Sequence, residues 1–159
     1  MIAYPIGNAG QRLVFATSVL NHLATHRQTR WWHSEAGGQL FARFEMPNIV
    51  IEAATGPRKS DRRSRFGYLP NRSAEQREIN ELHRNGLHFV GDWHTHPEPI
   101  PTPSPRDAES MRELFERSNH KLNGFVLAIV GRESFPYGLS VSVHTGMTAI
   151  QLAPDTMRL

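Results

Sequence analysis

The residues whose types and spacing could do chemistry lie in the segment GDWHTHP at positions 91–97 and just beyond it. On a strand, side chains alternate between faces, so His94 and His96 point the same way with Cα atoms about 6.6 Å apart. Two imidazoles at that spacing can bind one metal ion, and Zn²⁺ takes histidine nitrogens at about 2.0–2.1 Å. Asp107 follows eleven positions after His96 and can fold back as a third ligand. Three protein ligands leave one position for water, which is typical of catalytic zinc sites.

The same residues also have an interpretation without a metal. Ser104 followed by Pro105 and Asp107 matches a helix capping box, in which backbone N–H groups would occupy the Asp107 carboxylate. Two histidines in a strand can likewise be ordinary hydrogen-bonded residues. The combination of both features with the stiffening prolines and an acidic residue upstream favours a metal site.

Three other kinds of metal protein share fragments of this pattern. The motif D-x-H-x-H also opens amidohydrolase barrels, but such a barrel needs about 250 residues and would have to begin here at residue 92. Metallo-β-lactamase sites have the pattern H-x-H-x-D-H, whereas Glu98 and Pro99 occupy the last two positions in this chain. A cupin would be all-β, and the helix expected from Pro105 argues against it.

Composition limits the remaining function classes. The chain has 159 residues, of which 38% are hydrophobic and 21% charged, as expected for one globular domain spanning 1–159. The absence of cysteine excludes disulfides, thiolate zinc sites, Fe–S clusters and a cysteine nucleophile. A net charge of +3 is too small to indicate nucleic-acid binding by the whole chain. With no long apolar run and no signal-peptide pattern, we expect a soluble, cytoplasmic protein.

The elements that must position these residues follow from hydrophobic periodicity. Strands and helices interleave, which predicts an α/β or α+β fold with one mixed sheet and about three helices. The polar segment 56–70 is predicted to be a loop. A near-continuous apolar run at 125–130 predicts a central strand covered on both faces. Strands are expected over 13–16, 39–45, 48–54, 87–94, 125–130, 137–144 and 147–152, and helices over 17–27, 73–84 (capped by Ser73) and 105–118.

Several other polar residues have two open interpretations. His88 and Asp92 share the strand parity of the two histidines, so either could orient an imidazole or simply be polar on that face. Thr95 and Trp93 face away, and we expect Trp93 in the core and no chemical role for Thr95. A basic stretch around Asp61 could hold an acidic face of a protein substrate or be solvated. This stretch consists of Arg58, Lys59, Arg62, Arg63 and Arg65.

The whole set resembles the JAB/MPN domain metalloprotease family and its JAMM motif. In that family a glutamate precedes H-[ST]-H-P, ten residues and an aspartate, with a serine three positions before the aspartate. Here Glu35, the segment HTHP, Ser104 and Asp107 match, with the ten-residue gap from His96 to Asp107 kept. The family's E-x-G-G-x-L-x-G resembles EAGGQLFA at 35–42, where Ala42 departs from the last glycine. Glu45 and Glu52 are alternative glutamates, and the resemblance covers residues 11–150.

Within the family, the chain is most similar to small bacterial members encoded beside ubiquitin-like conjugating enzymes in CBASS anti-phage operons. The resemblance implies a JAB/MPN (cytidine-deaminase-like) fold and a zinc-dependent isopeptidase or peptidase. His94, His96 and Asp107 would hold one zinc ion, Glu35 would be the general base, and Ser104 would donate a hydrogen bond to the oxyanion.

The resemblance implies that the partner is a ubiquitin-like-modified protein conjugate, for example a nucleotidyltransferase joined by an E1/E2-like enzyme. We expect neither a membrane nor a nucleic acid as partner. Two alternatives from other classes stay open. One is a non-catalytic scaffold that binds a modifier, and the other is a zinc amidase for small molecules.

Overall fold

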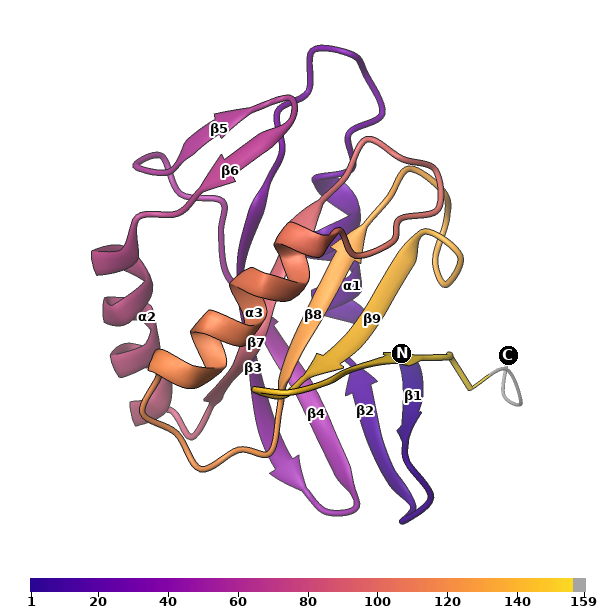
Figure 1. The fold of residues 1–159 in the computed structure, drawn as a ribbon, viewed down its shortest axis with the longest axis vertical. Helices are drawn as coiled ribbons and strands as arrows, with labels where there is room; N and C mark the ends of the chain where they lie inside the picture. The colour runs from indigo at the N-terminus through magenta and orange to yellow at the C-terminus, as the bar shows by residue number, and fades with distance from the viewer. Residues whose placement is uncertain (156–159) are drawn as a thin grey trace.

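The computed structural model describes residues 1–155, which form an eight-stranded mixed sheet, a two-stranded hairpin and three helices (Figure 1). The sheet order is β1-β2-β4-β3-β7-β8-β9-β10, with parallel pairing between β2 and β4 and between β7 and β8. The sheet strands are β1 (Ile2–Ile6), β2 (Gln11–Phe15), β3 (Gly37–Glu45), β4 (Asn48–Ala54), β7 (His88–Thr95), β8 (Phe125–Val130), β9 (Leu139–His144) and β10 (Ala149–Leu152). The helices are α1 (Thr17–Thr25), α2 (Arg72–Arg84) and α3 (Pro105–Arg117), and the hairpin consists of β5 (Arg62–Ser64) and β6 (Gly67–Leu69).

Helices cover both faces of the sheet, as the apolar pattern of β8 predicts. In Figure 1, α3 lies in front of the sheet, α2 stands at its left and α1 lies behind it. All six residues of β8 are buried. Phe125, Leu127 and Ile129 pack with Met111 of α3, whereas the alternate residues of β8 belong to the larger core that includes α1. The α+β class with one mixed sheet and three helices is therefore confirmed over the described residues.

One prediction about the elements is wrong, and one strand is missing from the expected set. The segment predicted as a loop at 56–70 contains the hairpin β5–β6, which hydrophobic patterning could not reveal because its strands have three residues each and β5 is fully exposed. The edge strand β1 lies outside the strands expected from the sequence; it is short and contains Pro5, yet it pairs with β2 and buries Tyr4 completely.

Smaller differences concern where elements begin. Helix α2 begins at Arg72, because Asn71 rather than Ser73 supplies the capping side chain. Strand β3 begins at Gly37 and β9 at Leu139. Trp93 lies in the core, as expected, and its indole donates a hydrogen bond to the Thr55 carbonyl. No helix in residues 1–155 is long and apolar enough to cross a membrane.

Candidate active site

The two histidines of the motif stand at the C-terminal end of β7 and converge on one point. The Nε2 atoms of His94 and His96 lie 3.0 Å apart. Asp107, at the start of α3, places Oδ1 3.2 Å from His94 Nε2 and Oδ2 3.4 Å from His96 Nε2. Segments eleven positions apart in the sequence thus bring two nitrogens and a carboxylate together, as the spacing predicts.

Asp107 also caps its own helix, so the two interpretations that the sequence left open hold together. The Asp107 N–H donates to Ser104 Oγ at 3.0 Å, and the Ser104 N–H donates to Asp107 Oδ2 at 2.8 Å. Burial alone would raise the pKa of Asp107, but hydrogen bonds from His94 and His96 outweigh it and hold that pKa far below its usual range. The capping box therefore delivers a carboxylate, in its charged form, to the histidines.

Glu35 joins this group from the loop before β3. Ligand-type atoms of Glu35, His94 and His96 all lie within 4.8 Å of one another. Burial raises the pKa of the Glu35 carboxyl, although the neighbouring histidines act in the opposite direction. The two alternative glutamates lie elsewhere: Glu45 ends β3 at its far end, and Glu52 on β4 pairs with Arg43.

The backbone around Glu35 is held by the unexpected hairpin and by β7. The Glu35 N–H donates to the Ser64 carbonyl at 2.6 Å, and Arg63 Nε donates to the Glu35 carbonyl at 2.8 Å. On the next residue, the Ala36 N–H donates to Thr95 Oγ1 at 2.9 Å, and the Thr95 N–H donates to the Ala36 carbonyl at 2.9 Å. The position of Glu35 relative to the histidines is thus fixed from two sides.

A buried glutamine connects these supports, and sequence reasoning missed it. Gln28, which is 1% exposed, accepts a hydrogen bond from Thr95 Oγ1 at 2.9 Å and donates one to the Arg65 carbonyl at 2.9 Å. Thr95, to which we assigned no chemical role, therefore links the histidine strand to both Ala36 and Gln28. Only the strand parity of Thr95, pointing into the interior, signals this role in the sequence.

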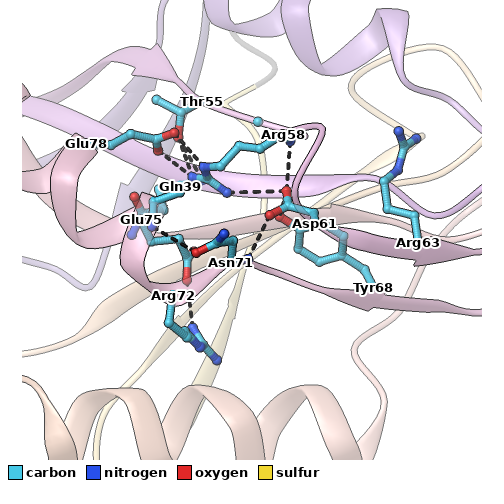
Figure 2. A network of polar contacts seen from close by, with 12 residues as sticks. Gln39, Thr55, Arg58, Asp61, Arg63, Tyr68, Asn71, Arg72, Glu75 and Glu78 are labelled. Atoms are coloured by element: carbon cyan, nitrogen blue, oxygen red, sulfur yellow. Dashed lines mark hydrogen bonds and ion pairs between the residues drawn. The ribbon is translucent and has the colours of Figure 1, made fainter.

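A polar network anchors the hairpin to α2 (Figure 2). Arg58, with 11% of its side chain exposed, reaches Glu78 on α2 and Asp61 in its own loop. Asp61 accepts hydrogen bonds from the N–H groups of Arg58 and Asn71 and from the Tyr68 hydroxyl. Although burial would raise the pKa of Asp61, these hydrogen bonds lower it below its ordinary value. Arg58 is thus structural, not part of an exposed basic face.

The glycines that follow Glu35 are required by the close packing of this hairpin and its neighbours. A Cβ on Gly37 would lie 2.6 Å from the Tyr68 ring, and one on Gly38 would lie 1.7 Å from the Thr55 carbonyl oxygen. The Glu-x-Gly-Gly spacing of the sequence therefore has a steric basis in this fold.

A pocket of about 520 Å³ opens over the site. Its walls include Glu35, both histidines and, from the hairpin side, residues 66–70. A larger groove of about 860 Å³ lies between α2 and α3, away from the histidines, and Asp92 lines both. Burial, and then the charge of Glu75, raises the pKa of Asp92 to about 7. In the described chain, neither Asp92 nor His88 makes a hydrogen bond to an imidazole, so the orienting role proposed for them finds no support.

The residues present fit a divalent zinc-type ion. Imidazole nitrogens with carboxylate oxygens are the donors that Zn²⁺ prefers when cysteine is absent. The Nδ1 of His96 is buried without a hydrogen-bond partner in the described residues and lies 3.5 Å from Glu98 Oε1. The Nε2 of His96 thus faces the other candidate ligands, His94 and Asp107, while the opposite nitrogen faces a carboxylate, as in many histidine–metal sites.

Comparisons with known proteins identify relatives of this chain. The family model described as prokaryotic homologs of the JAB domain matches residues 16–143. A protein of Pseudomonas aeruginosa named CD-NTase/cGAS isopeptidase is 33% identical over 127 residues, covering 77% of this chain and 78% of its own. Proteins of the same name from Vibrio cholerae (30% identical; 79% and 80% covered) and Escherichia coli (32%; 66% and 69%) are also similar.

The fold has a counterpart among solved structures. A protein of Desulfitobacterium hafniense, whose structure was determined in solution, superposes with a TM-score of 0.64 at 16% identity. The likeness covers 87% of this chain and 88% of that one. From the family match and the curated relatives, together with the Glu, His-x-His and Asp side chains that the fold gathers at one end of β7, this chain belongs to the family of prokaryotic JAB domain proteins.

Proposed function

We propose that this protein is a zinc-dependent isopeptidase that releases a CD-NTase from its conjugates in bacterial anti-phage signalling. The name shared by the curated relatives supports the isopeptide bond and the CD-NTase moiety. The observation that carries the proposal is the position of the Glu35 carboxylate within 4.8 Å of the two histidine nitrogens. A site that only bound a conjugate, without cleaving it, would not need a general base at that position.

His94, His96 and Asp107 would hold the zinc ion in this proposal. When bound, the ion would supply a water of lowered pKa and polarise the scissile carbonyl. The low pKa of Asp107 keeps its carboxylate charged at neutral pH, so it can act as a ligand without first losing a proton.

Glu35 has the properties of a general base and then a general acid. Burial raises its pKa, so the carboxylate is a stronger base than that of an exposed glutamate, and the same group can carry the proton to the leaving amine. Glu35 accepts a proton from the attacking water and returns it to the lysine Nε of the leaving group. Its backbone hydrogen bonds to Ser64 and Arg63 hold it in place during both transfers.

Ser104 is placed to stabilise the negative charge that develops on the carbonyl oxygen. Its Oγ accepts a hydrogen bond from the Asp107 N–H, so the hydroxyl hydrogen remains free to donate into the pocket that Ser104 lines. Removing one such donor costs about 10²–10³ in rate in enzymes where this has been measured.

The test compares the wild type with Glu35→Gln on one defined probe. This probe is a CD-NTase encoded in the same genome, joined through its C-terminal carboxyl to the Nε of a lysine in a fluorescent peptide. The amide of glutamine cannot accept a proton at neutral pH, so we expect cleavage to fall by about 10²–10⁴ while zinc content is unchanged. If Glu35→Gln cleaves the probe at the wild-type rate, Glu35 is not the general base. If the wild type hydrolyses small amides but not this probe, the protein is an amidase and not an isopeptidase.

A further inference from the structure

Three large aromatic side chains are exposed close to the site instead of being buried. Trp31 is 75% exposed, Trp32 61% and Phe66 76%. Their rings belong to two segments that contact each other, because the Arg65 guanidinium donates to the carbonyls of Trp31 and Arg30. Grouped apolar residues on a surface commonly mark a site where a partner binds.

The same surface is strongly basic. The guanidinium of Arg30 lies 5.9 Å from the ring centre of Trp32, and that of Arg65 lies 5.3 Å from the ring centre of Phe66. Arg62 and Arg63, on β5 of the same hairpin that carries Arg65 and Phe66, are also exposed. Asp61, the acidic residue of this stretch, is turned inward and bound by Arg58, Tyr68 and the N–H of Asn71, so it does not offset these charges.

This surface adjoins the pocket of the candidate site. Phe66 lines that pocket together with Glu35 and His94, and Arg63 binds the Glu35 carbonyl. If the terminal segment of a conjugated protein reaches the histidines, the folded part of that protein would therefore lie next to these aromatic and basic residues.

We propose that the Trp–Arg surface, formed by Arg30, Trp31, Trp32, Arg62 and Phe66, binds an acidic and partly apolar face of the folded CD-NTase moiety, while the pocket takes the conjugated chain end. Charge complementarity selects an acidic partner, and tryptophan with arginine provides most of the binding energy in many protein interfaces. This inference rests on the proposed function for the identity of the partner. The inference goes beyond the proposed function because it assigns recognition of a folded protein to residues outside the candidate active site.

The closing experiment measures binding separately from cleavage. The Glu35→Gln protein is titrated by calorimetry with the unconjugated CD-NTase encoded in the same genome. Two double variants in the Glu35→Gln background, Trp31→Ala/Trp32→Ala and Arg30→Glu/Arg62→Glu, remove the apolar and the charged contribution. The matched control is Arg77→Glu/Arg84→Glu, which reverses two exposed arginines on α2.

We expect both surface variants to raise Kd at least tenfold, because each removes two candidate hot-spot residues, and the control to stay within about twofold. Added salt is expected to weaken binding of the Glu35→Gln protein more than that of Arg30→Glu/Arg62→Glu. Unchanged Kd in both variants would overturn the proposal. The proposal would also be overturned if a single-stranded oligonucleotide bound through the same residues more tightly than the CD-NTase.

Cleavage of the conjugated probe by the wild type distinguishes failure of the inference from failure of the proposed function. If the wild type cleaves the probe but the surface variants keep the same Kd, the proposed role of the Trp–Arg surface is wrong and the isopeptidase activity stands. If the surface variants lose binding but the wild type does not cleave the probe, the isopeptidase proposal is wrong and the binding surface stands.

Discussion

Single residues in this site do more than one thing, and Asp107 is the clearest case. Its carboxylate contacts both histidines and accepts the Ser104 N–H, so helix capping and ligand delivery are one arrangement. Thr95 is similar, because one hydroxyl both accepts from the Ala36 N–H and donates to Gln28. The motif H-T-H therefore carries two candidate ligand side chains on one face and, between them, a buried support for Glu35 on the other.

Gln28 should act on catalysis through Glu35. We predict that Gln28→Leu lowers kcat by about 10–100-fold with KM nearly unchanged, because small misplacements of a catalytic group cost about that much. Zinc content should stay at the wild-type level. The acid limb of the kcat/KM profile against pH should shift, since a displaced Glu35 changes its burial and therefore its pKa.

Matched variants separate positioning by Gln28 from general destabilisation. Thr95→Ser keeps the hydroxyl and should retain activity, whereas Thr95→Val should behave like Gln28→Leu. Ile51→Val, a core change on β4, lowers stability by about 0.5–1.5 kcal/mol without touching this network. If Ile51→Val reduced kcat as much as Gln28→Leu, the positioning role would be wrong.

At the scale of elements, the sequence predicts well those elements that are stabilised by apolar periodicity or by local capping. The run at 125–130 predicts a central strand, and Ser104 with Pro105 predicts the start of α3, because both signals are local. The hairpin β5–β6 escapes prediction because its stability comes from contacts distant in sequence. Arg58 reaches Glu78 across 20 positions, and the hairpin backbone binds Glu35 across 29.

The same contrast applies to the site. Spacing alone predicts that His94, His96 and Asp107 converge, since a strand, a loop and a helix start determine their positions. Choosing Glu35 over Glu45 and Glu52 needs the resemblance or the fold, because the pairing of β3 with β7 decides which glutamate reaches the histidines. Gln28 lies in a loop without periodicity, so its burial follows only from the assembled structure.

The hairpin should depend on Asp61 in a pH-dependent way. At pH 7 we expect Asp61→Asn to lower the free energy of unfolding by about 2–4 kcal/mol, because it removes one partner of a buried, hydrogen-bonded ion pair. The pKa of Asp61 is below its ordinary value of 3.8 in the folded protein. Its contribution is therefore complete above that value and is lost as the pH falls through the lower, folded-state pKa.

Urea unfolding at pH 7 and near pH 3 measures this prediction about Asp61. The difference between wild type and Asp61→Asn should be smaller at the acid pH. Glu52→Gln serves as the control, since its pair with Arg43 is partly exposed and should contribute below about 1 kcal/mol at either pH. A difference for Asp61→Asn that stayed constant with pH would contradict the charge-based explanation.

At the scale of the whole molecule, the candidate metal ligands join two elements that are separate in the sequence. His94 and His96 stand at the end of β7, and Asp107 lies in the first turn of α3. An ion that binds all three in the folded state, and not in the unfolded chain, must stabilise the entire cooperative unit.

We therefore predict that zinc raises the Tm of metal-stripped protein. Free zinc at about 100 times Kd would contribute about 2.7 kcal/mol, which for a chain of this length corresponds to roughly 5–10 °C. His94→Ala/His96→Ala should show no such shift, because two of the three ligands are gone. Glu35→Gln should keep it, because Glu35 is proposed as a base and not as a ligand. Differential scanning calorimetry with and without zinc measures all three proteins. A zinc shift that persisted in the double histidine variant would place the metal elsewhere, and its loss in Glu35→Gln would make Glu35 a ligand.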